Sequence, residues 1–153
     1  MAARRKIRLL VVEDNPAYLH LVQEAFSNRR GQAQWDLTVA KDGEEALQVL
    51  LKQGREIANL PDIVLLDWNL PKVTGSEVLR QVKEHPKLRR MPVLVFSSSE
   101  ADEDIHAAYD NHANGYITKP DTVDALEAVV ETIERFWIAV ARLPKVARSI
   151  GLS

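Results

Sequence analysis

Short apolar runs alternate with segments of helical pattern along the chain. The strand candidates are 7–12, 35–40, 63–66, 93–96 and 116–117. Three of these runs are apolar at nearly every position, which is typical of strands that are covered on both faces. The alternation therefore predicts an α/β fold, with a parallel sheet between two layers of helices.

Polar caps and prolines predict where the helices begin and end. Asn15 with Pro16 predicts a helix to about residue 28, because an asparagine cap and a proline at the first helical position both favour a helix start. Asp42 with Gly43 opens a second helix, which is expected to reach about residue 53. The other helices are expected from just after Gly75 to about 85, from Ser99 or Glu100 to about 114, and from Asp121 or Thr122 to about 142.

These elements fill one domain, which we expect at 1–142. Residues 143–153 lie beyond the last helix and form a C-terminal extension in this interpretation. The polar stretch 52–61 is longer than the few residues that usually connect such elements. No internal repeat or second-domain boundary is visible in the sequence.

The composition of the chain limits the kinds of functional site and partner that it can have. The chain has 153 residues, a hydrophobic fraction of 46%, a net charge of -2 and no cysteine. The missing cysteines exclude disulfides, a thiolate nucleophile and a sulfur metal site. The weak net charge favours neither nucleic acid nor a membrane surface as a partner. The basic N-terminus leads into an apolar run too short for a signal peptide, and nothing approaches a membrane span, so we expect a cytoplasmic protein.

Polar side chains follow four of the predicted strands. Ligands of doubly wound sheets bind at the carboxyl ends of the strands, where the strand order reverses. The residues expected to face one crevice there are Glu13, Asp14, Asp67, Ser97 and Lys119.

The three carboxylates of this group need a counter-charge. Like charges in a crevice raise at least one pKa, whereas a divalent cation together with Lys119 brings the total charge to about zero. Mg²⁺ prefers oxygen ligands. The sequence therefore predicts a Mg²⁺ site.

A carboxylate beside such a cation can attack phosphorus and form an acyl phosphate. Lys119 would neutralise the phosphoryl oxygens, and Ser97 would donate a hydrogen bond to the bound group. Taken singly, each residue has a simpler interpretation: a helix cap, a strand end, a loop serine or a surface lysine. Their joint position at one sheet edge favours the functional interpretation.

Four motifs resemble the receiver domains of two-component response regulators, over residues 7 to about 140. They are Leu-Val-Val-Glu-Asp-Asn at 10–15, Leu-Leu-Asp-Trp-Asn-Leu-Pro at 65–71 followed by Gly75, Pro-Val-Leu-Val-Phe-Ser at 92–97, and Gly-Tyr-Ile-Thr-Lys-Pro at 115–120. The resemblance implies a flavodoxin-like sheet of five strands in the order 2-1-3-4-5, with five helices.

The resemblance also implies roles for the acidic residues. Asp67 matches the phosphoacceptor. Asp14 matches the carboxylate that touches the metal directly, and Glu13 the one that acts through water. Asn69 matches the residue whose backbone carbonyl completes the metal shell.

The same resemblance implies a switch. Ser97 matches the switch hydroxyl, and Tyr116 falls where the aromatic switch residue sits. Lys119 matches the lysine that precedes a cis bond to proline, here Pro120. The protein would accept a phosphoryl group without being an enzyme in its own right, apart from intrinsic autophosphorylation and autodephosphorylation.

Within this family the chain looks most like the short regulators paired with bacterial and cyanobacterial phytochromes. The carrying features are the long polar loop before residue 61, Leu-Pro-Lys at 70–72, Lys-Leu-Arg-Arg-Met-Pro at 87–92 and Phe-Trp at 136–137. The resemblance implies a sensor histidine kinase of the phytochrome type as partner. Thr74 departs from the aspartate that relatives often carry, at a position outside the chemistry.

The predicted fifth helix carries a wide apolar stripe. Few residues follow Pro120, so we expect no DNA-reading domain and an output through a surface. The stripe is either the core face of an end helix or part of a homodimer interface formed by the fourth helix, the fifth strand, the fifth helix and a C-terminal arm. The stripe residues are Leu126, Val129, Val130, Ile133, Phe136, Trp137 and Val140, and the arm residues are Leu143, Val146, Ile150 and Leu152.

Three other functions compete with this interpretation. An aspartyl phosphohydrolase would carry a second aspartate two residues after the nucleophile, where this chain has Asn69. A nucleotide or flavin carrier would show a glycine-rich loop after the first strand, and Glu13 with Asp14 would repel a phosphate there. An adaptor that is never phosphorylated would retain the fold without the chemistry.

Overall fold

The computed structural model describes residues 4–31, 33–52 and 60–144, and its centre is a parallel sheet of five strands. The strand order is β2-β1-β3-β4-β5, which confirms the predicted topology. The strands are β1 (Arg5–Val12), β2 (Ala33–Ala40), β3 (Ile63–Asp67), β4 (Val93–Ser97) and β5 (Gly115–Thr118).

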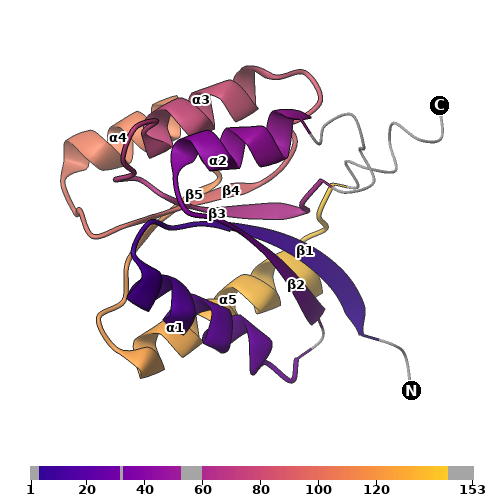
Figure 1. Cartoon of the computed structure of the whole chain (residues 1–153). Helices are drawn as coiled ribbons and strands as arrows, with labels where there is room; N and C mark the ends of the chain where they lie inside the picture. The colour runs from indigo at the N-terminus through magenta and orange to yellow at the C-terminus, as the bar shows by residue number, and fades with distance from the viewer. Residues whose placement is uncertain (1–3, 32, 53–59, 145–153) are drawn as a thin grey trace, which may run out of the picture.

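Helices cover both faces of the sheet (Figure 1). Helices α2, α3 and α4 lie on one face, and α1 and α5 lie on the other. The helices are α1 (Pro16–Ser27), α2 (Gly43–Leu47), α3 (Gly75–Glu84), α4 (Asp102–Asp110) and α5 (Val123–Glu134). The predicted flavodoxin-like architecture is therefore confirmed.

Alternation along the strands divides the core into two layers. In β1, Leu10 and Val12 belong to the layer beneath α2, α3 and α4, whereas Leu9 and Val11 belong to the layer beneath α1 and α5. Successive side chains of a strand point to opposite faces, so an all-apolar strand fills both layers. All five residues of β3 and all five of β4 are buried, as their sequences predict.

Side-chain caps fix most helix starts. Asn15, Asp42, Thr74 and Thr122 each accept a backbone N–H from the first turn of the helix that follows. Each such cap satisfies one or two of the amides that a helix leaves unpaired at its N-terminus. The predicted starts of the first, second and fifth helices are confirmed.

The predicted start of the fourth helix is wrong by two or three residues. Helix α4 begins at Asp102, after Ala101, which makes no side-chain cap. The Ser99 hydroxyl instead accepts the Ala101 N–H at 3.2 Å and lies 2.5 Å from an Asp104 carboxylate oxygen. Ser99 therefore connects the loop before α4 to the first turn of that helix, and residues 99–101 are not helical.

Two helices change pitch before they end. Residues Gln48–Lys52 after α2 and Arg135–Val140 after α5 form wider π turns instead of the continuous α-helices expected. In the second segment the Ala141 N–H donates to the Phe136 carbonyl, a spacing of five residues. This helical stretch ends at Val140, close to the predicted end, whereas the predicted end of the second helix lies outside the described residues.

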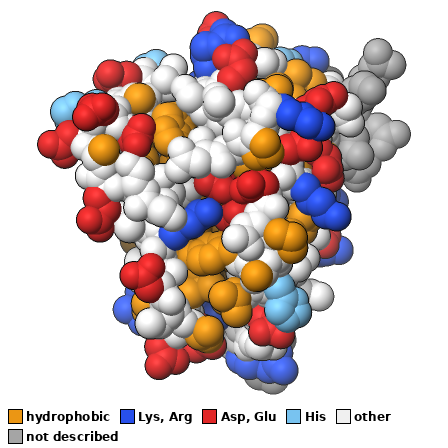
Figure 2. Space-filling view, turned by 60° about the vertical axis from the view of Figure 1, so that its left-hand side comes forward, with side chains coloured by type: hydrophobic (Ala, Val, Ile, Leu, Met, Phe, Trp, Pro, Cys, Tyr) orange, Lys and Arg blue, Asp and Glu red, His pale blue; other side chains and the backbone are white. Residues whose placement is uncertain are grey.

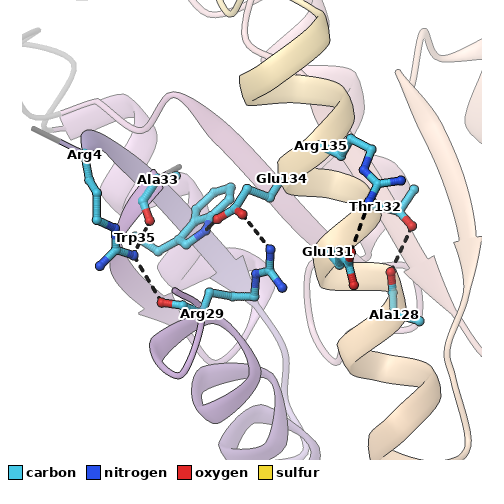
Figure 3. Close-up of polar contacts among 9 residues, drawn as sticks. All are labelled: Arg4, Arg29, Ala33, Trp35, Ala128, Glu131, Thr132, Glu134 and Arg135. Carbon is cyan, nitrogen blue, oxygen red and sulfur yellow. Dashed lines mark hydrogen bonds and ion pairs between the residues drawn. The ribbon is translucent and has the colours of Figure 1, made fainter. Parts of the chain in front are cut away.

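A buried polar cluster ties α5 to the edge of the sheet (Figure 3). The Glu134 side chain is 5% exposed and accepts hydrogen bonds from Arg29 Nη2 at 2.7 Å and from Trp35 Nε1 at 3.0 Å. Arg4 donates to the carbonyl oxygens of Arg29 and Ala33 on the same side. The cluster therefore joins α5 to β2 and to the segment between α1 and β2.

The C-terminal extension is described only at its beginning. Leu143 is 8% exposed and packs in the core layer beneath α1 and α5 of its own chain. The other residues predicted to form an arm lie outside the described part of the chain, so the arm stays a prediction. Within the described residues, no helix has the length and apolar character required to cross a bilayer.

Candidate functional site

The carboxyl ends of the central strands bring the predicted polar residues together. Glu13 and Asp14 follow β1, Asp67 and Ser97 are the last residues of β3 and β4, and Lys119 follows β5. The carboxyl edge is on the left of Figure 1, and Figure 2 turns it forward: acidic side chains gather near the middle of this face, next to a basic side chain and an apolar patch. The predicted polar residues therefore lie together at one edge of the sheet.

The three carboxylates form one group. Glu13, Asp14 and Asp67 each place a carboxylate oxygen within 4.8 Å of the other two. Glu13 and Asp67 are 3% and 4% exposed, whereas Asp14 is open to solvent. Two buried carboxylates and one exposed carboxylate offer oxygen ligands to a hard divalent cation, and the exposed side leaves room for the water that such a cation retains. The donor set therefore fits the predicted metal.

Lys119 lies against the buried carboxylates. Its Nζ is 2.8 Å from Glu13 Oε1 and 3.3 Å from Asp67 Oδ2, and its side chain is 15% exposed. Its backbone N–H donates to the Ser97 carbonyl at 2.8 Å, which fixes the start of the side chain relative to β4. The lysine thus supplies the one positive charge that contacts both buried acids among the described residues.

The acidic surroundings shift the protonation of the two central groups. Burial raises the pKa of the Asp67 carboxyl, and the charge of Glu13 raises it further. The Lys119 charge and the Asn69 N–H lower this pKa without cancelling the rise. Burial also acts to lower the pKa of Lys119, but its hydrogen bond to Glu13 and the charge of Asp67 outweigh burial and raise it. The lysine is therefore held in its charged form.

Asn69 and Ser97 complete the surroundings of Asp67. The Asn69 N–H donates to Asp67 Oδ1 at 3.1 Å, which orients the carboxylate. Ser97 is fully buried, and its Oγ accepts the Ser99 N–H at 3.1 Å. Both residues thus lie where the sequence predicted them, at the ends of the central strands.

Tyr116 connects β5 to the loop after β4. Its hydroxyl donates to the Ser99 carbonyl at 2.8 Å, two residues beyond Ser97. A change at Ser97 would therefore reach Tyr116 through one short piece of backbone. The predicted switch motion itself stays a prediction.

The predicted cis bond before Pro120 is wrong. No cis peptide bond occurs within the described residues, so the Lys119–Pro120 bond is trans. The trans form is intrinsically favoured by about 0.5–1 kcal/mol even before proline.

Sequence reasoning missed Tyr18 as part of this site. Its ring centroid lies 5.0 Å from Lys119 Nζ, on the first turn of α1. The available signal was its position four residues after Asp14, since a residue one helical turn into α1 stays close to the end of β1.

Gly75 is required for the close approach of α3 to the carboxyl end of β3. A Cβ at this position would lie 2.8 Å from Trp68 Cα and in contact with the Asp67 carbonyl oxygen. Both partners are backbone and cannot move without displacing Asp67. We expect Gly75→Ala to lower the free energy of unfolding by about 1–3 kcal/mol in urea titrations.

Gly115→Ala is the matched control for this variant. A Cβ there meets only a methyl group of Leu94, at 3.1 Å, which a small side-chain rotation relieves. We expect a much smaller loss of stability. Equal losses for the two variants would contradict the assigned role of Gly75.

Comparison with known proteins places the chain beside signalling regulators. Residues 9–131 match the response regulator receiver domain. The probable methanogenesis regulatory protein FilR2 of Methanothrix harundinacea is 40% identical over 138 residues, which are 89% of this chain and 86% of FilR2. Response regulator Rcp1 of Synechocystis sp. is 39% identical over 137 residues, 89% of this chain and 92% of Rcp1.

Solved structures agree with the sequence matches. The phosphorylated cyanobacterial phytochrome response regulator RcpA superposes with a TM-score of 0.79 at 43% identity, covering 93% of this chain and 99% of RcpA. The Mn²⁺-bound form of Rcp1 superposes with a TM-score of 0.79 at 37% identity, covering 90% of this chain and 99% of that one.

Proposed function

The chain belongs to the response regulator receiver domain family, and we propose that it accepts a phosphoryl group on Asp67 from a sensor histidine kinase. The observation that carries the proposal is the pairing of a buried Asp67 carboxylate with Lys119, beside the acidic pair Glu13 and Asp14. The phosphorylated state would signal through the surface of the domain. We place this activity in the cytoplasm and regard the protein as a phosphoacceptor with at most intrinsic autophosphorylation and autodephosphorylation.

The reaction is a transfer between two nucleophiles. An Asp67 carboxylate oxygen forms a bond to phosphorus while the bond from phosphorus to the donor breaks, and the donor group leaves with that electron pair. Lys119 stays protonated and balances charge on the phosphoryl oxygens. Ser97 donates its hydroxyl proton to one of these oxygens in a hydrogen bond.

We propose Mg²⁺ as the resident cation. Asp14 and Asp67 would bind it directly, Glu13 through water and Asn69 through its backbone carbonyl. When bound, the cation neutralises charge on the phosphoryl oxygens. Support comes from the clustered carboxylate oxygens and from the Mn²⁺-bound form of the relative Rcp1.

Trp68 reports on this metal site. It is 7% exposed and directly follows Asp67 in the sequence, so a change at the Asp67 carboxylate alters its surroundings. We expect its fluorescence to change saturably as Mg²⁺ is added, and Asp14→Asn to weaken the apparent affinity at least tenfold, since it removes a charged ligand. Trp35 and Trp137 also emit, so Trp68→Phe serves as the control and should lose the signal. A Mg²⁺ response that survives Trp68→Phe, or that ignores Asp14→Asn, would count against the site.

We infer that the partner is a kinase of the phytochrome type. The support is the likeness to the phytochrome regulator RcpA, whereas the likeness to FilR2 leaves kinases of another class as the competing outcome. The test is transfer of label from autophosphorylated kinases to the wild type and to Asp67→Asn. Fast transfer from a phytochrome-type kinase only, absent in the mutant, supports the assignment; preference for another kinase refutes the phytochrome partner and leaves the chemistry intact.

We further propose a homodimer through α4, β5 and α5, with the C-terminal extension as an arm. Large apolar side chains stay exposed on α4, on α5 and on the helical stretch that follows α5: Tyr109 at 49%, Val123 at 51%, Phe136 at 50% and Val140 at 72%. Exposed apolar patches on otherwise polar surfaces mark interaction sites. A monomeric mass at micromolar concentration, unaltered by removal of residues 143–153, would exclude the dimer.

A further inference from the structure

Lys119 contacts both carboxylates and an aromatic ring. Its Nζ lies 2.8 Å from Glu13 Oε1 and 3.3 Å from Asp67 Oδ2. The same Nζ lies over the face of the Tyr18 ring, 5.0 Å from the ring centroid. An ammonium over an aromatic face is attracted by the electron density of the ring. The ring therefore limits the directions in which the ammonium can turn away from Asp67.

Tyr18 is itself fixed at both ends. Its backbone N–H donates to the Asn15 cap at 3.1 Å, and its hydroxyl donates to the Pro120 carbonyl at 3.4 Å. The ring also packs against the core layer beneath α1 and α5. These contacts join the first turn of α1 to the segment after β5, so the ring cannot swing away without breaking them.

The phenol of Tyr18 stays neutral. Burial, followed by the negative charges of Glu13, Asp121 and Asp67, raises its pKa to about 12. A neutral phenol keeps its proton for the bond to Pro120 and adds no charge beside Lys119. Tyr18 therefore offers Lys119 only its ring face.

The ring also forms part of the wall of a pocket beside the site. This pocket of about 290 Å³ is lined by Tyr18, Ser98, Lys119 and Asp121, among others. A smaller side chain at position 18 would open the pocket further beneath the ammonium. Water would then solvate Lys119 on the side that the ring now covers, and would compete with its contact to Asp67.

We propose that Tyr18 is a positioning residue for phosphoryl transfer: its ring face restrains the Lys119 ammonium beside Asp67 and excludes water from the part of the ammonium that the ring covers. The inference rests on the proposed function. Tyr18 exchanges no proton and touches no reacting atom; the bond to phosphorus forms at Asp67, the donor leaves with its electron pair, and Lys119 keeps its charge. The residue acts only through the place and hydration of Lys119.

A series of ring substitutions separates this role from a structural one. Tyr18→Phe keeps the ring, and versions of this variant whose ring carries one, two or three fluorine atoms keep its size while weakening its attraction for a cation. We expect the rate of phosphoryl uptake from acetyl phosphate to stay within about twofold for Tyr18→Phe and to fall stepwise to about fivefold lower with three fluorines. The rate of phosphoryl uptake by Tyr18→Leu should fall at least as far. Equal rates of phosphoryl uptake in all the fluorinated variants would overturn the proposal.

A second measurement tests the contact without any reaction. In the metal-free protein, the proton resonances of the Lys119 ε-CH₂ should be shifted upfield by the ring and should return toward ordinary values in Tyr18→Leu. No ring-dependent shift would also overturn the proposal. A wild type that takes up no phosphoryl group, yet shows the shift, would refute the proposed function; normal wild-type uptake with equal rates in all the fluorinated variants would refute Tyr18 alone.

Discussion

Lys119→Met is expected to slow phosphoryl uptake from acetyl phosphate by about 100-fold or more. Methionine has nearly the length of lysine but no charge, so the variant removes the cation that contacts Glu13 and Asp67 while filling the same space. The phosphoryl oxygens then lose a fixed positive partner in the transition state. Intact mass at timed intervals, with Mg²⁺ present, gives the rate.

Lys83→Met is the control for Lys119→Met. Lys83 donates to the carbonyl oxygens of Arg89 and Met91 and to Asn114 Oδ1, next to the starts of β4 and β5. These contacts are at the opposite edge of the sheet from Asp67. We expect lower stability and normal uptake in this variant. Wild-type uptake in Lys119→Met, or an equal slowing in both variants, would contradict the role of Lys119.

Arg29→Met is expected to lower the free energy of unfolding by about 3 kcal/mol. The variant leaves Glu134 buried and without its cationic partner, with the neutral N–H groups of Trp35 and Ala33 to stabilise the carboxylate. Removing one member of a buried ion pair costs more than the pair contributes, because the remaining charge has lost its hydration. Urea unfolding at pH 7 measures the loss.

An exposed ion pair within one turn of Glu134 offers a matched comparison for the buried pair (Figure 3). Arg135 pairs with Glu131 at 3.2 Å, but the two side chains are 73% and 51% exposed. Arg135→Met should therefore cost well under 1 kcal/mol, as exposed pairs do. If both arginine variants lost the same stability, burial of Glu134 would not be the cause.

The Glu134 cluster also predicts a dependence of stability on pH. Burial alone would raise the pKa of Glu134, but hydrogen bonds from Arg29 and Trp35, with the charge of Arg29, outweigh burial and hold the pKa below its usual range. A pKa lower in the folded than in the unfolded state contributes stability above the unfolded value, about 4.3. This contribution is lost as the pH falls through the lower folded pKa. The difference in stability between the wild type and Arg29→Met should therefore shrink as the pH falls below about 4.

The strands and the meeting of the polar residues at one sheet edge were predictable because both depend on local signals, whereas the strand order followed from the family resemblance. Unbroken apolar runs mark strands covered on both faces, and the polar residues that end those runs meet at one edge of a parallel sheet. Asp67 and Ser97 fall on the last residues of β3 and β4 for this reason. Caps such as Asn15 and Thr122 act within one turn and are equally visible in the sequence.

The errors and omissions involve contacts that the sequence does not display. The start of α4 was misplaced because Ser99 binds Asp104, outside the pattern of an ordinary cap. The partner of Glu134 could not be found, since Arg29 lies 105 residues away along the chain. Tyr18 could not be assigned to the site, because its contact with Lys119 joins two segments that are far apart in the sequence.

Asp67 is the phosphoacceptor in the proposed function. The most direct test of this role is the intact mass of the protein after incubation with acetyl phosphate, with and without Mg²⁺, for the wild type and for Asp67→Asn. We expect a single phosphoryl adduct that requires Mg²⁺ and is absent from Asp67→Asn. No adduct on a folded wild type, or an adduct that survives Asp67→Asn, would contradict the claim.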